Sequence, residues 1–249
     1  MSIDDRGALS APAVGPSRDV TGRELFGQYA AHYDAALAKG LSVSGEDKDY
    51  FARGRMVWLA RCMRELGERV DTVMDFGCGT GSATSYVLDL IDPKQTLGID
   101  VSPESVELAR RDHGSERTRF ALFDEYRPNA EIDLVFCNGV FHHIPLSERA
   151  TALSYVYRSL RPGGLFALWE NNPWNPGTRL VMSRIPFDRD AITLSAPAAR
   201  RMLSSSGFSV VRTDFLFIFP RMLRGLRGLE PLMSRLPVGA QYQVLCRKR

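Results

Sequence analysis

The chain has 249 residues, 44% of them hydrophobic and 24% charged, which is the composition of an ordinary globular protein and excludes a disordered or membrane-embedded chain. The 32 Lys and Arg against 29 Asp and Glu leave a net charge of only +3, so the sequence predicts no nucleic-acid partner. It contains neither an apolar run of the ~18 residues that span a bilayer nor a signal peptide, so we expect a cytoplasmic protein. No CxxC spacing or disulfide framework is present, which predicts reduced thiols and no metal site: the cysteines are Cys62, Cys78, Cys137 and Cys246.

The composition divides the chain into three parts. Residues 1–20 are rich in Ala, Pro, Ser and Gly without periodicity and are predicted to be a poorly ordered leader. Residues 21–69 hold two helical patterns, one from about residue 23 to 40 and one that starts near Asp47 and ends at the cap residue Gly67. We expect these helices to cover the active site of a core domain at residues 70–249, which carries an insertion at residues 218–240.

Short apolar runs alternate with helical segments along the core domain. This alternation predicts an α/β fold, with a doubly wound, mostly parallel sheet covered by helices on both faces. Two further strands follow the last crossover, with the insertion between them. The predicted strands are residues 72–76, 96–100, 119–123, 134–137, 165–169, 208–217 and 242–246, and the predicted helices between them are 82–90, 103–112 and 147–160.

A glycine loop joins the first predicted strand to the first helix of the core, in the segment VMDFGCGTGS at residues 73–82. Glycine removes the side chain where a backbone turns sharply and approaches a ligand beside the N–H groups of a helix start. The spacing is GxGxG, at Gly77, Gly79 and Gly81. A dinucleotide-binding loop would carry its third glycine one place later, at Ser82, so the loop favours a nucleoside ligand without pyrophosphate.

A carboxylate lies at or just after the end of each of the first three strands, at the edge where such sheets bind ligands. Asp75 lies beside the glycine loop, Asp100 closes the second strand and Asp124 follows the third. Asp100 can accept both ribose hydroxyls, Asp124 can accept the adenine amino hydrogens, and Phe123 can cover the purine face. S-adenosylmethionine, which has hydroxyls and amines but no phosphate, matches this set.

The stretch of residues 73–170 resembles the class I S-adenosylmethionine-dependent methyltransferases, in particular the broad group that acts on small molecules and lipid-linked acceptors. The resemblance implies a Rossmann-like sheet of seven strands with an antiparallel last strand. It also implies S-adenosylmethionine as the cofactor and S-adenosylhomocysteine as its product. The matching motifs are DFGCGTG at 75–81, GID at 98–100, FD at 123–124, DLVFCNGVFHHI at 133–144 and LRPGG at 160–164.

The resemblance also implies cofactor contacts that spacing alone does not give. Asn138 and Val140 would line the methionine part, and Tyr33 would fold over the cofactor. Arg53 or Arg55 would pair with the cofactor carboxylate. The complete predicted cofactor site is Tyr33, Asp75, Gly77, Gly79, Gly81, Asp100, Val101, Phe123, Asp124, Asn138 and Val140.

Two histidines are the predicted catalytic residues. Methyl transfer to an oxygen or nitrogen usually requires loss of the acceptor proton, and a histidine with a pKa near neutrality is a suitable base. His142 and His143 follow the fourth strand at the ligand-binding edge, with His142 as the better candidate for the base and His143 on the cofactor side. The alternative is that one of the two packs against the cofactor or caps a loop.

The predicted acceptor site is the segment WENNPWNPG at residues 169–177, which directly extends the fifth strand. Its acidic, amide and aromatic side chains are suited to orient an acceptor, whereas Asn-Pro pairs alone would only form turns. The predicted substrate contacts are Glu170, Asn171, Asn172 and Trp174.

The insertion contains a basic amphipathic segment at residues 221–236. We expect a lid whose apolar stripe is buried beside the acceptor cleft. Peripheral contact with a membrane surface or an anionic lipid-linked acceptor is the first alternative, and nucleic acid is the second. On a helical wheel the segment separates Met222, Leu226, Leu229, Met233 and Leu236 from Arg221, Arg224, Arg227 and Arg235.

Together these features predict an enzyme that transfers a methyl group from S-adenosylmethionine to a small or lipid-linked acceptor, at oxygen. N- or C-methylation of a small molecule and a non-catalytic S-adenosylmethionine-binding protein are the alternatives. A nicotinamide oxidoreductase is more distant, and tight binding of S-adenosylhomocysteine without NAD binding would exclude it.

Overall fold

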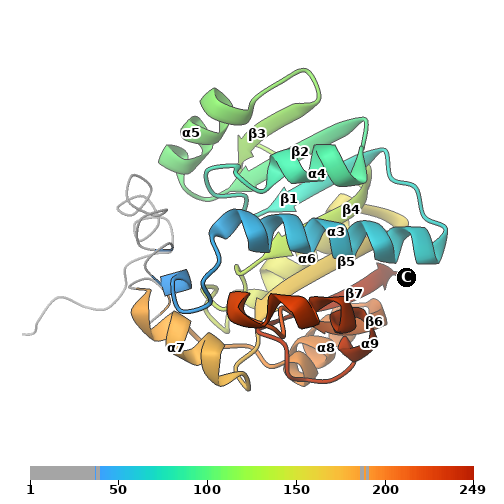
Figure 1. The fold of residues 1–249 in the computed structure, drawn as a ribbon. Helices are drawn as coiled ribbons and strands as arrows, with labels where there is room; N and C mark the ends of the chain where they lie inside the picture. The colour runs from blue at the N-terminus through green and yellow to red at the C-terminus, as the bar shows by residue number, and fades with distance from the viewer. Residues whose placement is uncertain (1–36, 38–39, 186–187, 189–190) are drawn as a thin grey trace, which may run out of the picture.

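The computed structural model describes residues 37, 40–185, 188 and 191–249 (Figure 1). The predicted leader, most of the first predicted helix and the cofactor residue Tyr33 lie outside the described residues. Within them, one sheet of seven strands has the order β3-β2-β1-β4-β5-β7-β6. The strands are β1 (Thr72–Phe76), β2 (Gln95–Asp100), β3 (Thr118–Leu122), β4 (Ile132–Asn138), β5 (Leu160–Asn171), β6 (Phe208–Leu216) and β7 (Gln241–Lys248).

The direction of the strands confirms the predicted fold class. Strands β1 to β5 pair in parallel, whereas β7 is antiparallel to both β5 and β6. The carboxyl ends of the parallel strands therefore meet at one edge of the sheet, which is where ligands of doubly wound folds bind.

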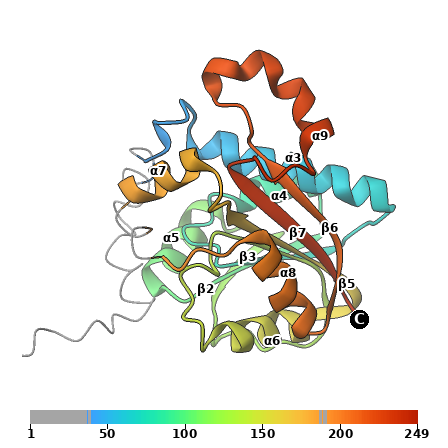
Figure 2. The same ribbon diagram turned by 90° about the horizontal axis from the view of Figure 1, so that it is seen from below.

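Helices cover both faces of the sheet, with α3 and α4 on one side and α6 and α8 on the other (Figure 2). One core cluster joins Met56 and Leu59 of α3 to Leu134 of β4. A second cluster joins Leu153 of α6 and Leu203 of α8 to the opposite face. The helices are α3 (Lys48–Leu66), α4 (Thr84–Ile91), α5 (Pro103–His113), α6 (Arg149–Ser159), α7 (Pro176–Arg184), α8 (Ala196–Ser205), η2 (Arg221–Leu229) and α9 (Glu230–Met233).

Helix α3 has the ends that the sequence predicts. The Asp47 carboxylate accepts a 2.8 Å hydrogen bond from the backbone N–H of Tyr50, which caps the first turn. Gly67 ends the helix in the left-handed conformation, with φ of 68°. No helix of the described residues is long and apolar enough to cross a bilayer, and all four cysteines are free and buried.

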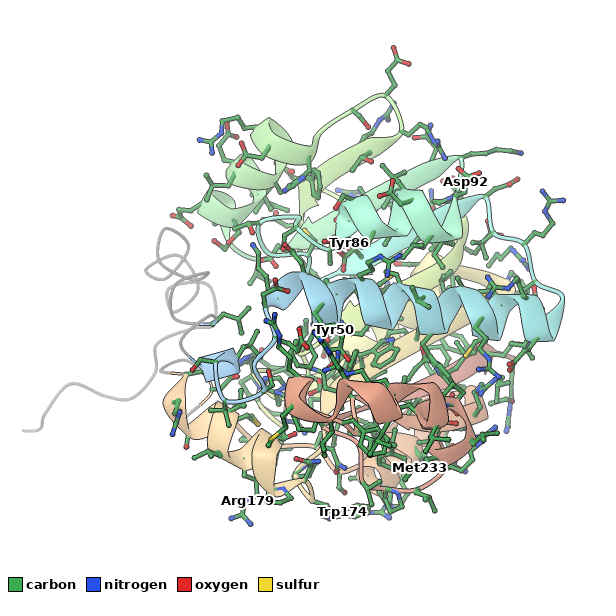
Figure 3. All side chains as sticks on the ribbon, in the orientation of Figure 1. Tyr50, Tyr86, Asp92, Trp174, Arg179 and Met233 are labelled. Atoms are coloured by element: carbon green, nitrogen blue, oxygen red, sulfur yellow. The ribbon has the colours of Figure 1, made fainter. Side chains whose placement is uncertain are left out.

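The insertion between β6 and β7 folds into η2 and α9, but the predicted burial of its apolar stripe is wrong. Met222 is 87% exposed, and Leu226 and Leu229 are 44% and 47% exposed. The reason is that one arginine of the basic side, Arg227, turns inward and anchors the segment. Arg227 donates to Glu46 at 2.9 Å, and its guanidinium lies 4.5 Å from the ring centre of Tyr50, which lies between α3 and η2 (Figure 3).

Candidate active site

The glycine loop lies at the carboxyl end of β1, and its turn depends on Gly77 and Gly79. Both have left-handed backbone, with φ of 75° and 54°. A β-carbon at Gly77 would lie 2.4 Å from Val140 Cγ2, so the loop packs directly on the segment that follows β4. A β-carbon at Gly79 would meet nothing within 4 Å, which leaves room for a ligand beside the loop.

Asp100 is bound to this loop. Its carboxylate accepts hydrogen bonds from the backbone N–H groups of Gly79 at 2.8 Å and Ser102 at 2.9 Å. Each carboxylate oxygen keeps a second lone pair, so two ribose hydroxyls can still donate to it. Burial raises the pKa of Asp100, but the two backbone N–H groups oppose that rise by stabilising the carboxylate.

The predicted adenine contacts follow β2 and β3 along the same edge. Val101 is 44% exposed, and Phe123 and Asp124 lie in the turn after β3, where Asp124 is exposed. The Phe123 ring stacks on Tyr155 with its centre 4.1 Å away, so a purine could use only the opposite face of Phe123.

Asp75 of β1 and Arg55 of α3 are near enough to interact electrostatically. Asp75 is buried and accepts a 3.2 Å hydrogen bond from the Thr84 hydroxyl. Burial raises the pKa of Asp75 to about 7, although the Thr84 hydrogen bond lowers it. Arg55 is buried and donates to Gln241 at 3.0 Å, whereas Arg53 is exposed. Of the two arginines, Arg55 is thus the one placed to reach a cofactor carboxylate.

A cavity of about 370 Å³ is lined by Arg55 and Gln241. It reaches Asn138 and Gly139 at the end of β4, and His142, His143 and Asp188 stand in its wall. The rest of the wall is mainly apolar and comes from α3, α7 and the chain after β6, including Phe51, Met182, Ile185, Phe217 and Phe219.

His142 is held between two carboxylates. Its Nδ1 lies 2.5 Å from Glu170 Oε2 and its Nε2 lies 3.6 Å from Asp188 Oδ1. The other Glu170 oxygen accepts a 2.9 Å hydrogen bond from the backbone N–H of Phe141. His143 lies beside this group, with its Nε2 3.2 Å from the same Asp188 oxygen.

The two imidazoles have opposite charge preferences. Burial alone would lower the pKa of His142, but Glu170 and Asp188 outweigh it and raise the pKa to about 10. The pKa of His143 is lowered, mainly by burial and also by the neighbouring His142, against the pull of Asp188. At neutral pH, His142 is therefore a cation and His143 is a neutral imidazole that can accept a proton.

We predict that Glu170→Gln lowers the free energy of unfolding by about 3 kcal/mol, because it leaves a buried cation with one partner fewer. The pKa of His142 is raised on folding, so its contribution to stability is full below pH 6.5 and is lost as pH rises through about 10. Urea unfolding across this pH range should show that the free energy of unfolding falls less steeply with pH in the variant than in the wild type. Glu125→Gln is the matched control, because Glu125 is exposed. An equal dependence of the free energy of unfolding on pH in the wild type and Glu170→Gln would contradict the ion pair between His142 and Glu170.

The predicted acceptor residues are only partly brought to the cavity. Asn171 lines it and accepts a 3.2 Å hydrogen bond from Gln241. Glu170 is buried behind His142, and Asn172 is buried with its amide bonded to the carbonyls of Pro237 and Gly239. Trp174 is 53% exposed and does not line the cavity. The structure therefore gives Glu170 and Asn172 supporting positions rather than acceptor contacts.

Asp188 and Gln241 are site residues that the sequence did not reveal. Asp188 lies 45 positions after His143 in the chain, outside any recognised motif, and Gln241 begins the last strand. Asp188 also completes a set that could hold a metal ion, because ligand atoms of His142, His143 and Asp188 lie within 4.8 Å of one another. The ion pairs to Glu170 and Asp188 explain the same arrangement without a metal.

The family comparisons agree with this geometry. A family model described as a methyltransferase domain matches residues 74–166. Trans-aconitate 2-methyltransferase of Azoarcus sp. (strain BH72) is 30% identical over 131 residues, 51% of this chain and 51% of that protein. The protein of the same name from Methylobacterium nodulans is 30% identical over 198 residues, 70% of this chain and 74% of that protein. O-methyltransferase cnsE of Penicillium expansum is 26% identical over 164 residues, 61% of this chain and 58% of that protein.

A solved structure shares the fold. Human N-acetylserotonin methyltransferase in complex with its cofactor superimposes with a TM-score of 0.59 at 20% identity, covering 92% of this chain and 60% of that one. The doubly wound sheet, the glycine loop and the carboxylate that closes β2 define a Rossmann-like nucleoside-binding protein. The chain belongs to the class I S-adenosylmethionine-dependent methyltransferases, and S-adenosylmethionine is its cofactor. It spans only about half the length of the Azoarcus relative.

Proposed function

We propose that the protein transfers a methyl group from S-adenosylmethionine to an oxygen atom of a small molecule with an apolar body. The position of the cavity carries the proposal, because its wall contains Asn138, a predicted cofactor contact, together with His143 and Asp188. Its volume of about 370 Å³ is within the range of small-molecule sites. The names of the trans-aconitate methyltransferases and of the O-methyltransferase support a small acceptor and an oxygen atom, respectively.

The chemistry needs alignment, a base and a dry site. S-adenosylmethionine would supply an activated methyl group, which the acceptor oxygen would take in line while the sulfur kept the electron pair of the broken carbon–sulfur bond. His143 takes the acceptor proton, and Asp188 stabilises the imidazolium that results. Glu170 and His142 hold Asp188 in place, and the apolar wall excludes water.

Three alternatives share parts of this site. N- or C-methylation would use the same cavity, and a non-catalytic binding protein would use only the cofactor residues. A lipid-linked acceptor is a narrower form of the proposal, supported by the apolar wall that Phe51, Phe217 and Phe219 provide.

We expect that incubation with S-adenosylmethionine labelled in its methyl group transfers the label to an oxygen of a small molecule in a cell extract, detected by mass spectrometry. Label on nitrogen or carbon would assign the reaction to an alternative. Tight binding of S-adenosylhomocysteine with no labelled product in any extract fraction would contradict the proposed methyl transfer.

A further inference from the structure

The insertion presents an exposed apolar surface. Leu223 and Leu226 of η2 are 43% and 44% exposed, and the most exposed side chains are Met222 at 87% and Leu232 at 83%. Large exposed apolar side chains that gather in one segment are typical of an interaction site in a globular protein. We call residues 221–238, together with Trp174, the apolar-basic face.

Trp174 is fixed next to the end of this insertion. The amide of Asn172 donates to the carbonyl of Pro237 at 3.1 Å, and that of Asn175 donates to Val238 at 2.7 Å. The loop between them therefore holds Trp174, which is 53% exposed, beside Val238, which is 46% exposed. Figure 3 shows Trp174 projecting from the body of the protein, as Arg179 of α7 does.

The exposed charge of the apolar-basic face is positive. Arg221, Arg224 and Arg235 are exposed, and Glu230 is the only acidic residue in the segment. Glu230 is buried, because its two oxygens accept hydrogen bonds from the backbone N–H groups of residues 217–219. An anionic surface would therefore meet arginines and apolar side chains without an opposing exposed carboxylate of this segment.

This face adjoins the cavity. Phe219 and Pro220, which lead into η2, line the cavity wall, and Arg227 of η2 lines it as well. Figure 2 shows η2 and α9 standing out from the body of the protein on the side of α3.

We propose that the apolar-basic face docks on an anionic lipid bilayer, so that an acceptor carried by a lipid passes from the bilayer into the cavity. Apolar side chains flanked by arginines and a tryptophan are the composition of segments that lie in the membrane interface. The identity of the acceptor rests on the proposed function, whereas the docking itself does not.

The test is cosedimentation of the full chain with phosphatidylcholine vesicles that contain or lack phosphatidylglycerol. We expect binding that requires phosphatidylglycerol and weakens at high salt. Arg221→Glu with Arg224→Glu should weaken it by at least about 25-fold, because the loss of each arginine near an anionic surface costs roughly fivefold and each new glutamate adds repulsion. Met222→Ser with Leu232→Ser should weaken it at both salt concentrations, because it removes buried apolar contact with the bilayer.

Matched controls change the same residue types elsewhere. Arg119→Glu with Arg158→Glu reverses two exposed arginines of β3 and α6, and Leu146→Ser removes an exposed leucine outside the face. These variants should bind vesicles like the wild type. Equal losses in the control variants would overturn the proposal, since binding would then follow net charge alone.

Two further outcomes would overturn the docking. Absence of vesicle binding by the wild type would mean that this face does not dock on a bilayer and that its partner is a protein. A large fall in the thermal midpoint of Met222→Ser with Leu232→Ser, without vesicles, would mean that the chain itself covers the stripe. The thermal shift with S-adenosylhomocysteine is measured in parallel, so that a failure of cofactor binding contradicts the proposed function and leaves the vesicle result standing.

Discussion

Replacing Asp100 with alanine is expected to weaken the binding of S-adenosylhomocysteine by about 10²- to 10⁴-fold. Two ribose hydroxyls would lose a charged acceptor, and each such hydrogen bond is worth about 1.5–3 kcal/mol. The loop would lose its anchor as well, because the Asp100 carboxylate also accepts from the backbone N–H groups of Gly79 and Ser102. Calorimetric titration measures the affinity, and thermal unfolding shows whether the free protein stays folded.

Two variants separate the ribose contact from the support of the loop. Asp100→Asn keeps one oxygen acceptor and should bind with intermediate affinity. Asp112→Ala, an exposed carboxylate of α5, should bind like the wild type. An affinity of Asp100→Ala equal to that of the wild type would remove Asp100 from the cofactor site.

The fold could be predicted from local patterns, because a buried parallel strand and an amphipathic helix each have a characteristic pattern of hydrophobic residues. The bounds of β1 and the two ends of α3 are where the sequence placed them. Strand β5 starts five residues earlier than predicted, at Leu160 rather than at residue 165. The segment 161–164 contains a proline and two glycines, which are typical of a turn, and a shift of register beside β4 accommodates the early start.

The side chains of the site were less predictable, because polarity does not say which partner a group finds. Glu170 has the composition of an acceptor contact, but the backbone N–H of Phe141 and the ring of His142 occupy its two oxygens. The helical wheel of residues 221–236 assumed one α-helix, whereas residues 221–229 form the 3-10 helix η2, which is kinked at Leu223. It could not show that Arg227 would turn inward to Glu46, which leaves the leucines outside. Both outcomes depend on residues that are far apart in the chain.

Contacts between distant residues also reverse the roles that the sequence suggested for the two histidines. The sequence favoured His142 as the base, since either imidazole has a suitable pKa when it is unperturbed. In the fold, Glu170 keeps His142 protonated at neutral pH, and a protonated imidazole cannot take the acceptor proton. Both imidazoles line the cavity, and His143, whose pKa is lowered, is the one that can take the proton.

Replacing His143 with alanine is therefore expected to lower kcat by about 10²- to 10⁴-fold, the usual contribution of a general base. The affinity for S-adenosylhomocysteine should stay nearly unchanged, since the base acts on the acceptor. In the wild type, kcat/KM should fall only below pH 6.5, because the pKa of His143 lies below its usual value and the protonated ring is inactive. Asp188→Asn should lower kcat less than the loss of His143 does. The variant loses the charge that stabilises the imidazolium, but the base itself stays in place.

The half-buried His113, at the end of α5, provides the matched control, and His113→Ala should keep full turnover. His142→Ala should instead lower the thermal midpoint, because Glu170 would be left buried without its partner. A chelator should leave the wild-type rate unchanged. Turnover that EDTA abolishes and zinc restores would contradict the base, since His143 would then be a ligand of a metal held with His142 and Asp188. Normal turnover of His143→Ala would mean that the acceptor oxygen arrives already ionised, so that the site needs only to align it with the methyl group.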